Sequence, residues 1–253
     1  MRSFFIGLQF LTRISLVKQV EWTEEDFGES VRWFPLIGAV LGLCYAGMAG
    51  LLFFLLPMQC IVVPQHVCAA MLLVLTVLLT GGIFCDGFMD SMDGIFSGRS
   101  REKMLEIMKD SRVGANGVMA FVSLMLLEWS LFLDMDRLQL LIAVFIMPII
   151  SRMMVVMAIT CFPYARPNGM GKAFATYAGK EALLIAMVST IFLVFPLGRL
   201  AVFAFFIAAC FAWCFCRYVT KLLGGLTGDI YGATAMLAEL VVLFSVLAGS
   251  CFL

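Results

Sequence analysis

Long apolar segments occupy most of this chain and limit what it can fold into. A helix that crosses the hydrocarbon core of a bilayer needs about 20 mainly apolar residues. Several segments of the chain approach or exceed that length, and short polar stretches separate them. We therefore predict these candidate spans: Phe34–Leu56, Val62–Cys85, Ala115–Leu133, Leu138–Thr160, Ala182–Leu197, Ala201–Cys216 and Ala233–Leu253.

The composition excludes a water-soluble protein. Hydrophobic residues make up 63% of the sequence and charged residues 13%, against about 45–50% and about 25% in soluble domains. We expect an all-α, polytopic membrane bundle of about seven helices, which forms one membrane-embedded catalytic domain over residues 1–253. The fifth and sixth spans meet at Gly198, so they form a tight hairpin or one of them is re-entrant. The start, 1–33, is expected to be a cytoplasmic or interfacial segment.

Lysine and arginine are distributed unevenly between the two ends of the predicted spans. Arg137 and Arg199 lie on one side and Arg152 lies inside a span, whereas every other Lys and Arg falls on the opposite side. Cytoplasmic loops carry the excess of positive charge. The N-terminus and the long polar loops are therefore predicted to be cytoplasmic, and any chemistry is expected there. The zero net charge gives no reason to expect a nucleic-acid partner.

Three aspartates after the second span form the strongest candidate site. Asp86, Asp90 and Asp93 are spaced i, i+4, i+7, which places them along one face of a helix. Carboxylates in this arrangement repel one another unless a cation lies among them, and Mg²⁺ is bound through carboxylates together with substrate phosphates. We therefore predict that the three aspartates hold Mg²⁺. Gly87 is expected to let a bulky ligand approach the backbone. The alternative is a solvated polar helix end.

Basic residues follow the aspartates, so the segment 86–114 is predicted to be a cytoplasmic catalytic loop. Arginine suits phosphate because its guanidinium donates two parallel hydrogen bonds. Arg99 and Arg112 are therefore candidates, with Asp110 next to the latter. The alternative is that these cations only fix the topology. For Arg112 the two interpretations have equal support from the residues alone.

A second glycine-rich stretch precedes the last span and repeats a spacing seen earlier. The pattern GGxxxD occurs from Gly81 to Asp86 and again from Gly224 to Asp229, with Thr227 inside the second copy. Because glycine pairs are common at helix ends, the repeat is suggestive only. A third element, the basic loop that contains Arg166 and Lys172, falls on the same predicted side. No Walker A, Rossmann, GxSxG or HExxH motif occurs, which disfavours ATP-driven transport and metalloprotease chemistry.

Two acidic residues fall within predicted spans. Glu239 lies one or two turns into the last span, and an acid inside a membrane is a functional hypothesis by default. The alternative is a structural acid that pairs with Arg152. Glu128 lies near the outer end of the third span, where we expect it to reach water.

Several separated motifs occur along the chain in a recognisable order. They are Phe10-LTRI, Phe34-PLIGAVLG, Gly81-GIFCDGFMDSMDGIFSG, Ile107-MKDSRVGANG, Tyr164-AR, Gly169-MGKAF and Gly224-GLTGDIYGA. Taken together, these motifs resemble the cobalamin synthase family of adenosylcobinamide-GDP ribazoletransferases. The resemblance covers most of the chain, and it is most specific in the stretch that holds the three aspartates. The chain departs from the family pattern in bulkier residues between those aspartates and in the stretch around Asn116.

The resemblance implies a transferase that joins adenosylcobinamide-GDP to α-ribazole, or to its 5′-phosphate, and releases GMP with Mg²⁺ as cofactor. Its partners would be these corrinoid and ribazole substrates and the lipid of the bacterial cytoplasmic (inner) membrane. A homo-oligomer or an association with other enzymes of the pathway stays open. Asp86, Asp90, Asp93 and Arg112 would be catalytic. Substrate would be bound by Arg13, Arg99, Asp110, Asn116, Arg152, Arg166, Lys172, Thr227, Asp229 and Glu239.

Two other classes of protein use acidic residues at a membrane face. A CDP-alcohol phosphotransferase also places aspartates around Mg²⁺, but its pattern has Ala-Arg after the second Asp-Gly, where this chain has Ile95-Phe96. A divalent-cation transporter needs acids near the middle of the bilayer that both faces can reach. Here the acids gather at one end of the spans, which disfavours transport.

Overall fold

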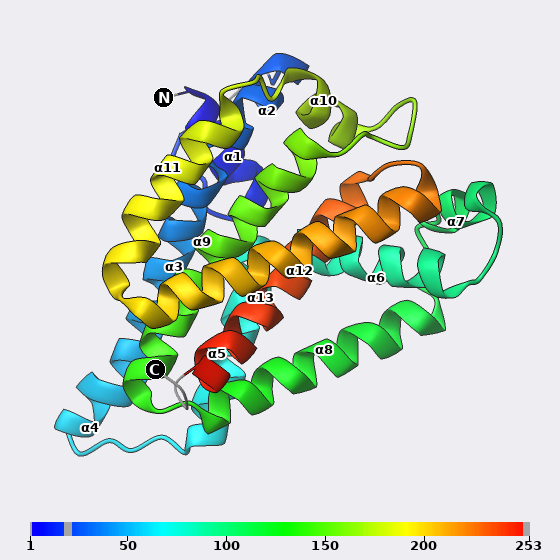
Figure 1. Ribbon diagram of the computed structural model, residues 1–253. Helices are drawn as coiled ribbons and strands as arrows, with labels where there is room; N and C mark the ends of the chain where they lie inside the picture. The colour runs from blue at the N-terminus through cyan, green and yellow to red at the C-terminus, as the bar shows by residue number, and fades with distance from the viewer. Residues whose placement is uncertain (1, 18–21, 250–253) are drawn as a thin grey trace.

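The computed structural model describes residues 2–17 and 22–249, and in this part of the chain it contains helices and connections but no strand (Figure 1). The first half consists of α1 (Arg2–Leu11), α2 (Glu24–Ser30), η1 (Val31–Trp33), α3 (Phe34–Gly50), η2 (Leu51–Leu55), α4 (Leu56–Met58), α5 (Gln65–Thr80), α6 (Ile83–Phe96) and α7 (Arg101–Ile107). The second half consists of α8 (Ala115–Asp134), α9 (Arg137–Cys161), α10 (Met170–Tyr177), α11 (Ala182–Val194), η3 (Phe195–Leu197), α12 (Arg199–Leu223) and α13 (Gly228–Gly249).

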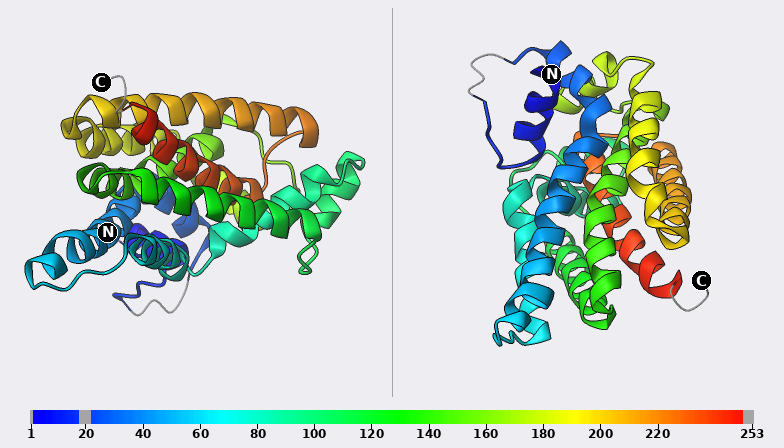
Figure 2. Two further views of the ribbon diagram at one scale, coloured as in Figure 1. Left: turned by 90° about the horizontal axis from the view of Figure 1, so that it is seen from below. Right: turned by 90° about the vertical axis from the view of Figure 1, so that its left-hand side faces the viewer.

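The helices α9 and α13 form the centre of the bundle (Figures 1 and 2). In their most apolar stretches, 78% of α9 and 72% of α13 is buried, against 28% of α8 and 33% of α12. The helix α3 packs along α9, while α6 and α12 pack on α13. The outer helices expose large apolar side chains such as Leu126 of α8 and Phe206 of α12. Such a surface suits lipid rather than water.

Five helices are long and apolar enough to cross a membrane: the continuous stretch Glu24–Met58, and α8, α9, α12 and α13. Two bent pairs, α5–α6 and α10–α11, raise the number to seven if each counts as one span. The predicted polytopic helical bundle is confirmed. The predicted span Val62–Cys85 needs correction, because α5 ends at Thr80 and α6 turns away by 92°. Gly81 and Gly82 allow this turn, since both have positive φ.

Several other predicted boundaries also move. The sixth span is the full 25-residue helix α12, and the seventh begins at Gly228 rather than at Ala233. Gly198, with a φ of 104°, separates η3 from α12 as the predicted tight turn. The predicted catalytic loop 86–114 consists mainly of the helices α6 and α7. In the segment 1–33, α1 packs onto α2 and α3.

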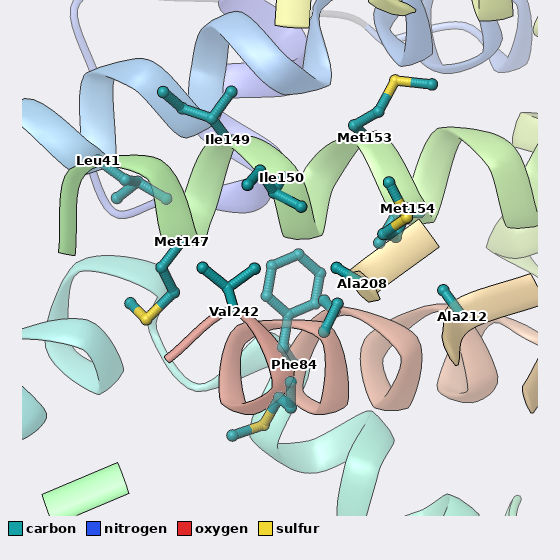
Figure 3. Packing of buried hydrophobic residues seen from close by; sticks show 14 of the residues in the cluster. Leu41, Phe84, Met147, Ile149, Ile150, Met153, Met154, Ala208, Ala212 and Val242 are labelled. Atoms are coloured by element: carbon teal, nitrogen blue, oxygen red, sulfur yellow. The ribbon is translucent and has the colours of Figure 1, made fainter. Parts of the chain in front are cut away.

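A buried ion pair lies in the core between α9 and α13. Arg152 is 1% exposed and hydrogen-bonds to Glu239, and Ser151 Oγ donates a bond of 3.0 Å to the same carboxylate. The Arg152 guanidinium also stands 4.7 Å from the centre of the Phe84 ring, which packs among apolar residues of α9, α12 and α13 (Figure 3). These contacts compensate most of the positive charge of Arg152, which would be costly inside a membrane without a partner. The alternative of a structural Glu239–Arg152 pair is therefore what the structure contains.

Glu128 corrects another prediction. Its side chain is only 2% exposed, and its Oε1 atom has no hydrogen-bond partner among the described residues. The prediction that Glu128 reaches water at the outer end of α8 is therefore wrong. Glu128 lies on the face of α8 that packs against the bundle, so it is buried although it is close to the end of the helix.

Candidate active site

The two copies of GGxxxD build two similar helix breaks. In the first copy, Gly81 closes α5 with a φ of 64°, and Asp86 follows in the first turn of α6. In the second copy, Gly224 closes α12 with a φ of 74°, and Asp229 follows in the first turn of α13. Positive φ favours glycine because a Cβ would be strained there. The repeat in the sequence therefore reflects a repeated turn that starts a helix with an acid.

A close crossing of α6 and α13 brings the two acids to one region. A Cβ atom added at Gly87 would lie 3.0 Å from the Asp229 carbonyl oxygen, and one added at Gly232 would lie 3.3 Å from Gly87 Cα. Larger residues at either position would push the helices apart. Gly87 thus allows the close crossing of the two helices, and it also lines the cavity that lies beside the crossing, where the absence of a side chain lets a ligand approach the backbone. The consequence is that Asp86 and Asp229 line the same cavity.

The connection between α9 and α10 adds an arginine to this region. Ala165 N donates to Leu226 O at 2.7 Å, and Leu226 N donates to Pro163 O at 2.8 Å. These bonds tie the connection to the turn between α12 and α13. They place Arg166 so that its Nη2 atom lies 2.8 Å from Asp229 Oδ2. Its Nε atom has no hydrogen-bond partner among the described residues and remains available as a donor.

Thr227 fixes the start of α13. Its hydroxyl accepts a hydrogen bond from Ile230 N at 3.3 Å and donates one to Asp229 Oδ2 at 3.2 Å. Thr227 is fully buried. It therefore orients Asp229 from behind and does not line the cavity, although the sequence analysis placed it among the substrate-binding residues.

A small cavity of about 250 Å³ lies between these elements. Its polar wall consists of Asp86, Asp229 and Arg166. Its aromatic residues, which form the aromatic wall, come from five helices and one connection and are Phe10, Phe34, Phe84, Tyr164, Phe174 and Tyr231. Three of these rings pack edge to face. The centre of the Phe174 ring lies 5.3 Å from that of Phe10 and 5.8 Å from that of Phe34. The small cavity is therefore lined by both aromatic rings and charged side chains.

A larger cavity of about 910 Å³ adjoins the small one. Arg13, Trp22 and Thr80 help to line it. It shares Phe10, Ile83 and Asp86 with the small cavity, and Asp86 is the one charged residue among the three. Arg13 N donates to Leu79 O at 2.7 Å, and the Arg13 side chain lies so close to Gly81 that a Cβ there would collide with Nε. Asp86 is exposed at the junction of the two cavities.

The other two aspartates of the cluster are placed differently from Asp86. Asp93 is 8% exposed, and its two carboxylate oxygens accept hydrogen bonds from Gly114 N at 2.7 Å and Gly117 N at 2.8 Å. It thus satisfies free amides at the start of α8. Asp90 is half-buried, and the charges of Asp86, Asp229 and Asp93 all act on it.

That Asp86, Asp90 and Asp93 together hold Mg²⁺ therefore stays a prediction. No group of three His, Cys, Asp or Glu residues within the described ranges is arranged to enclose a metal ion. Along a helix, Asp93 lies about 10 Å beyond Asp86, and α8 holds its carboxylate. The donor set still suits Mg²⁺, because this ion is usually bound by one or two carboxylates and by substrate phosphates. Asp86 and Asp90 or Asp229 offer such a pair.

The basic residues that follow the aspartates do not line the two cavities. Arg112 donates from Nη2 to Asp110 Oδ2 at 2.8 Å and from Nε to Asp110 Oδ1 at 3.1 Å. Hydrogen bonds from Arg112 lower the pKa of the Asp110 carboxyl to about 2. The Arg112 side chain is 87% exposed. Arg99 is exposed and Asn116 is half-buried. The structure therefore does not bring Arg112 to the other predicted catalytic residues.

Three further predicted substrate-binding residues also lie outside the cavity walls described above. Lys172 donates from Nζ to Pro167 O and lines a third cavity with Tyr177 and with Trp22, which also lines the large cavity. Arg152 and Glu239 pair in the core behind Phe84. Of the predicted substrate-binding residues, Arg13, Arg166 and Asp229 line the two cavities.

The aromatic residues of the small cavity were not predicted from the sequence. Phe10, Tyr164 and Tyr231 are far apart in the sequence, and the chain contains 24 Phe and 5 Tyr residues, so no single ring stands out. The one available signal was that Phe10, Tyr164 and Tyr231 each fall in a motif of the family resemblance. Burial raises the pKa of the Tyr164 phenol, and Tyr231 OH has no hydrogen-bond partner among the described residues.

Comparisons with known proteins agree in one family. The family model described as cobalamin-5-phosphate synthase matches residues 3–248. A relative from Desulfitobacterium hafniense, named adenosylcobinamide-GDP ribazoletransferase, is 40% identical over 96% of this chain and 95% of its own length. Relatives with the same name from Brevibacillus brevis and Clostridium acetobutylicum are 36% and 34% identical, over 100% and 98% of this chain and 100% and 96% of their own lengths.

No solved structure matches the chain significantly. The family match nevertheless covers nearly the whole chain, and the full-length relatives share one name. The rival assignments to a CDP-alcohol phosphotransferase and to a cation transporter do not fit these matches. The chain belongs to the cobalamin-5-phosphate synthase family of transferases.

Proposed function

We propose that this chain joins adenosylcobinamide-GDP to ribazole, or to ribazole 5′-phosphate, and releases GMP. The relatives carry that activity in their names. The observation that supports it most is the pair of adjoining cavities that share the exposed carboxylate of Asp86. A reaction between two large substrates requires two binding regions that meet at the reacting groups.

The reaction is a phosphoryl transfer. A ribose hydroxyl oxygen of ribazole bonds to the phosphorus that carries the cobinamide, and the bond from that phosphorus to the bridging oxygen breaks. GMP leaves with the bridging oxygen, and the hydroxyl proton passes to a carboxylate. Arg166 offers an unpartnered Nε donor, which can stabilise negative charge on the transferred phosphoryl group.

The acids of the site divide between two tasks in this proposal. Asp229 already pairs with Arg166 and holds that guanidinium in place. Asp86 and Asp90 therefore remain to bind a metal and to accept the proton. Mg²⁺ would neutralise charge on the pyrophosphate when it is bound. Two carboxylates suffice for this ion, because phosphate oxygens and water supply the other ligands.

We also propose that the cavities face the cytoplasm of a bacterial cell, with the protein in the cytoplasmic membrane. The uneven distribution of Lys and Arg supports this orientation. Asp86 and Asp229, in the first turns of α6 and α13, and Asp90, one turn further along α6, would then lie on the cytoplasmic side. The nucleotide substrate is charged and would reach these acids without crossing the bilayer.

The decisive experiment supplies both substrates to the purified protein in lipid vesicles. We expect release of GMP and formation of the joined corrinoid only when adenosylcobinamide-GDP, ribazole and Mg²⁺ are all present. Omission of each component in turn is the control. Release of GMP that does not depend on ribazole would contradict the proposal, as would flux of metal ions across the vesicle without any corrinoid product.

A further inference from the structure

We infer that the small cavity binds the flat base of the ribazole nucleoside, and that the large cavity binds the pyrophosphate-bearing arm of the corrinoid substrate. This assignment rests on the function proposed above and adds where each substrate lies. Four observations carry it: the sizes of the cavities, the chemistry of their walls, the unpartnered polar atoms and the shared residue.

The size of the cavities separates the two substrates. The small cavity measures about 250 Å³, which suits a single nucleoside better than a larger ligand. The large cavity measures about 910 Å³. A corrin ring with its side chains exceeds either space. Only the arm that carries the pyrophosphate and the guanosine can therefore enter the large cavity, while the ring stays outside.

The walls differ in the same sense. Rings of Phe10, Tyr164 and Phe174 surround the small cavity, and flat heteroaromatic bases bind well against aromatic side chains. Phe10 and Trp22 also line the large cavity, but its wall adds Arg13 and the hydroxyls of Thr12, Ser15 and Thr80. Arg13 is exposed there, and a guanidinium is well suited to bind pyrophosphate oxygens.

An unpartnered hydroxyl points to a ligand in the small cavity. Tyr231 is 4% exposed, and its phenol oxygen makes no hydrogen bond among the described residues. A buried hydroxyl without a partner is unfavourable. A nitrogen of the bound base or a ribose hydroxyl would supply the missing partner, which assigns Tyr231 a role in binding the nucleoside.

The shared residue explains how the two substrates meet. Asp86 lines both cavities. A base in the small cavity and a pyrophosphate in the large one would bring the ribose hydroxyl and the phosphorus together beside this carboxylate. The reverse arrangement would place the bulky nucleotide in a space of about 250 Å³ and leave the aromatic wall without a flat partner.

The test measures binding of each substrate alone, so that no turnover occurs. Titration calorimetry with detergent-solubilised protein and Mg²⁺ would compare the wild type with variants of each cavity. Tyr231→Phe removes only the hydroxyl. Gly228→Ile adds bulk at the small cavity, where a Cβ would meet only Gly171 backbone atoms at 3.9 Å. Arg13→Gln removes the charge from the large cavity, and Arg13→Lys restores it.

We expect Tyr231→Phe and Gly228→Ile to weaken ribazole binding about fivefold and about tenfold or more, respectively, with cobinamide-GDP binding changed less than about twofold. Arg13→Gln should weaken cobinamide-GDP binding about tenfold and leave ribazole binding unchanged, and Arg13→Lys should recover part of the loss. Gly47→Ala, where a Cβ meets nothing within 4 Å, controls for general effects of substitution.

The opposite pattern would overturn the assignment, and so would equal weakening of both substrates by variants of either cavity. In both cases the proposed function would survive if the wild type still released GMP. A wild type that binds neither substrate would refute the proposed function itself, and the assignment with it. The two failures are therefore distinguishable.

Discussion

The two helix breaks share a backbone design but differ in their charges. At each break a glycine with positive φ is followed five residues later by an aspartate, and an arginine lies over the glycine: Arg13 over Gly81, and Arg101 over Gly224. The first aspartate, Asp86, is exposed and forms no ion pair within the described residues. The second, Asp229, is paired with Arg166.

The difference shows how one local pattern can supply two roles. Asp86 is exposed at the junction of the cavities, where a bound cation or substrate can reach it. Asp229 instead uses its charge to hold Arg166 beside the same cavity. The repeated turn places one acid at the start of each helix. The connection between α9 and α10 then pairs Arg166 with Asp229 and leaves Asp86 without a basic partner among the described residues. Each prediction below separates these roles.

Substitution of the two acids should have the largest effects. Asp86→Asn should reduce the rate of GMP release at least about a hundredfold, because it removes a charge at the reacting groups, with little change in thermal stability. Asp229→Asn should reduce the rate less and should destabilise the fold by about 1–3 kcal/mol, since a largely buried guanidinium loses its charged partner. Rate assays and thermal unfolding in detergent would check both. Equal losses of rate and stability in the two variants would break the comparison.

Substitution of the glycines of the first turn should have smaller effects. Gly82→Ala should cost about 1–2 kcal/mol of stability, because an alanine is strained at a φ of 73°. Gly81→Ala has a similar φ but adds a collision with Arg13, so it should cost about 1 kcal/mol more. Thermal unfolding measures the difference. Identical costs would show that Arg13 does not hold the turn.

Asp93→Asn should affect the fold rather than the chemistry. The asparagine side chain retains one acceptor oxygen for one of the two backbone N–H groups, those of Gly114 and Gly117, but it presents an NH₂ group to the other. We expect a loss of about 1 kcal/mol in unfolding free energy. Thermal unfolding and amide exchange at Gly114 and Gly117 would detect it. Unchanged exchange at these amides would contradict the capping role.

The smallest effect should come from the exposed loop. Arg112→Gln should change the rate less than about twofold, since the pair with Asp110 is exposed and distant from the cavities. The pKa of Asp110 is lowered to about 2. The pair therefore stabilises the fold fully above the ordinary carboxyl pKa and loses that contribution as the pH falls toward 2. The rates of GMP release by wild type and variant, measured as a function of pH, should coincide between pH 6 and pH 8. Different rates in that range would indicate that Arg112 acts in the active site.

Much of the fold could be predicted from the sequence, because apolar length and charge asymmetry are local signals. The bend at Gly81–Gly82 was not predicted, since the apolar character continues through it to Cys85 and only the backbone conformation reveals the break. Likewise, the helical spacing of Asp86, Asp90 and Asp93 indicated one face of α6. It gave no information about α8, whose amides take the carboxylate of Asp93.

The candidate site was predictable only in part for a similar reason. The second GGxxxD copy identified Asp229, and the basic loop after the fourth predicted span identified Arg166. The aromatic wall consists of rings that come together through tertiary packing, and no spacing in the sequence predicts that packing. Conversely, Arg112 and Lys172 had suitable chemistry, but short-range contacts hold each of them away from the two cavities.

The central claim is that Asp86 acts in the chemistry while Asp93 holds the structure. The most direct measurement is the rate of GMP release by Asp86→Asn and by Asp93→Asn, with both substrates and Mg²⁺ saturating and each rate normalised to folded protein. The account predicts that Asp93→Asn retains at least about a tenth of the wild-type rate, and that Asp86→Asn retains less than about a hundredth. Equal rates in the two variants, or a greater loss in Asp93→Asn, would contradict it.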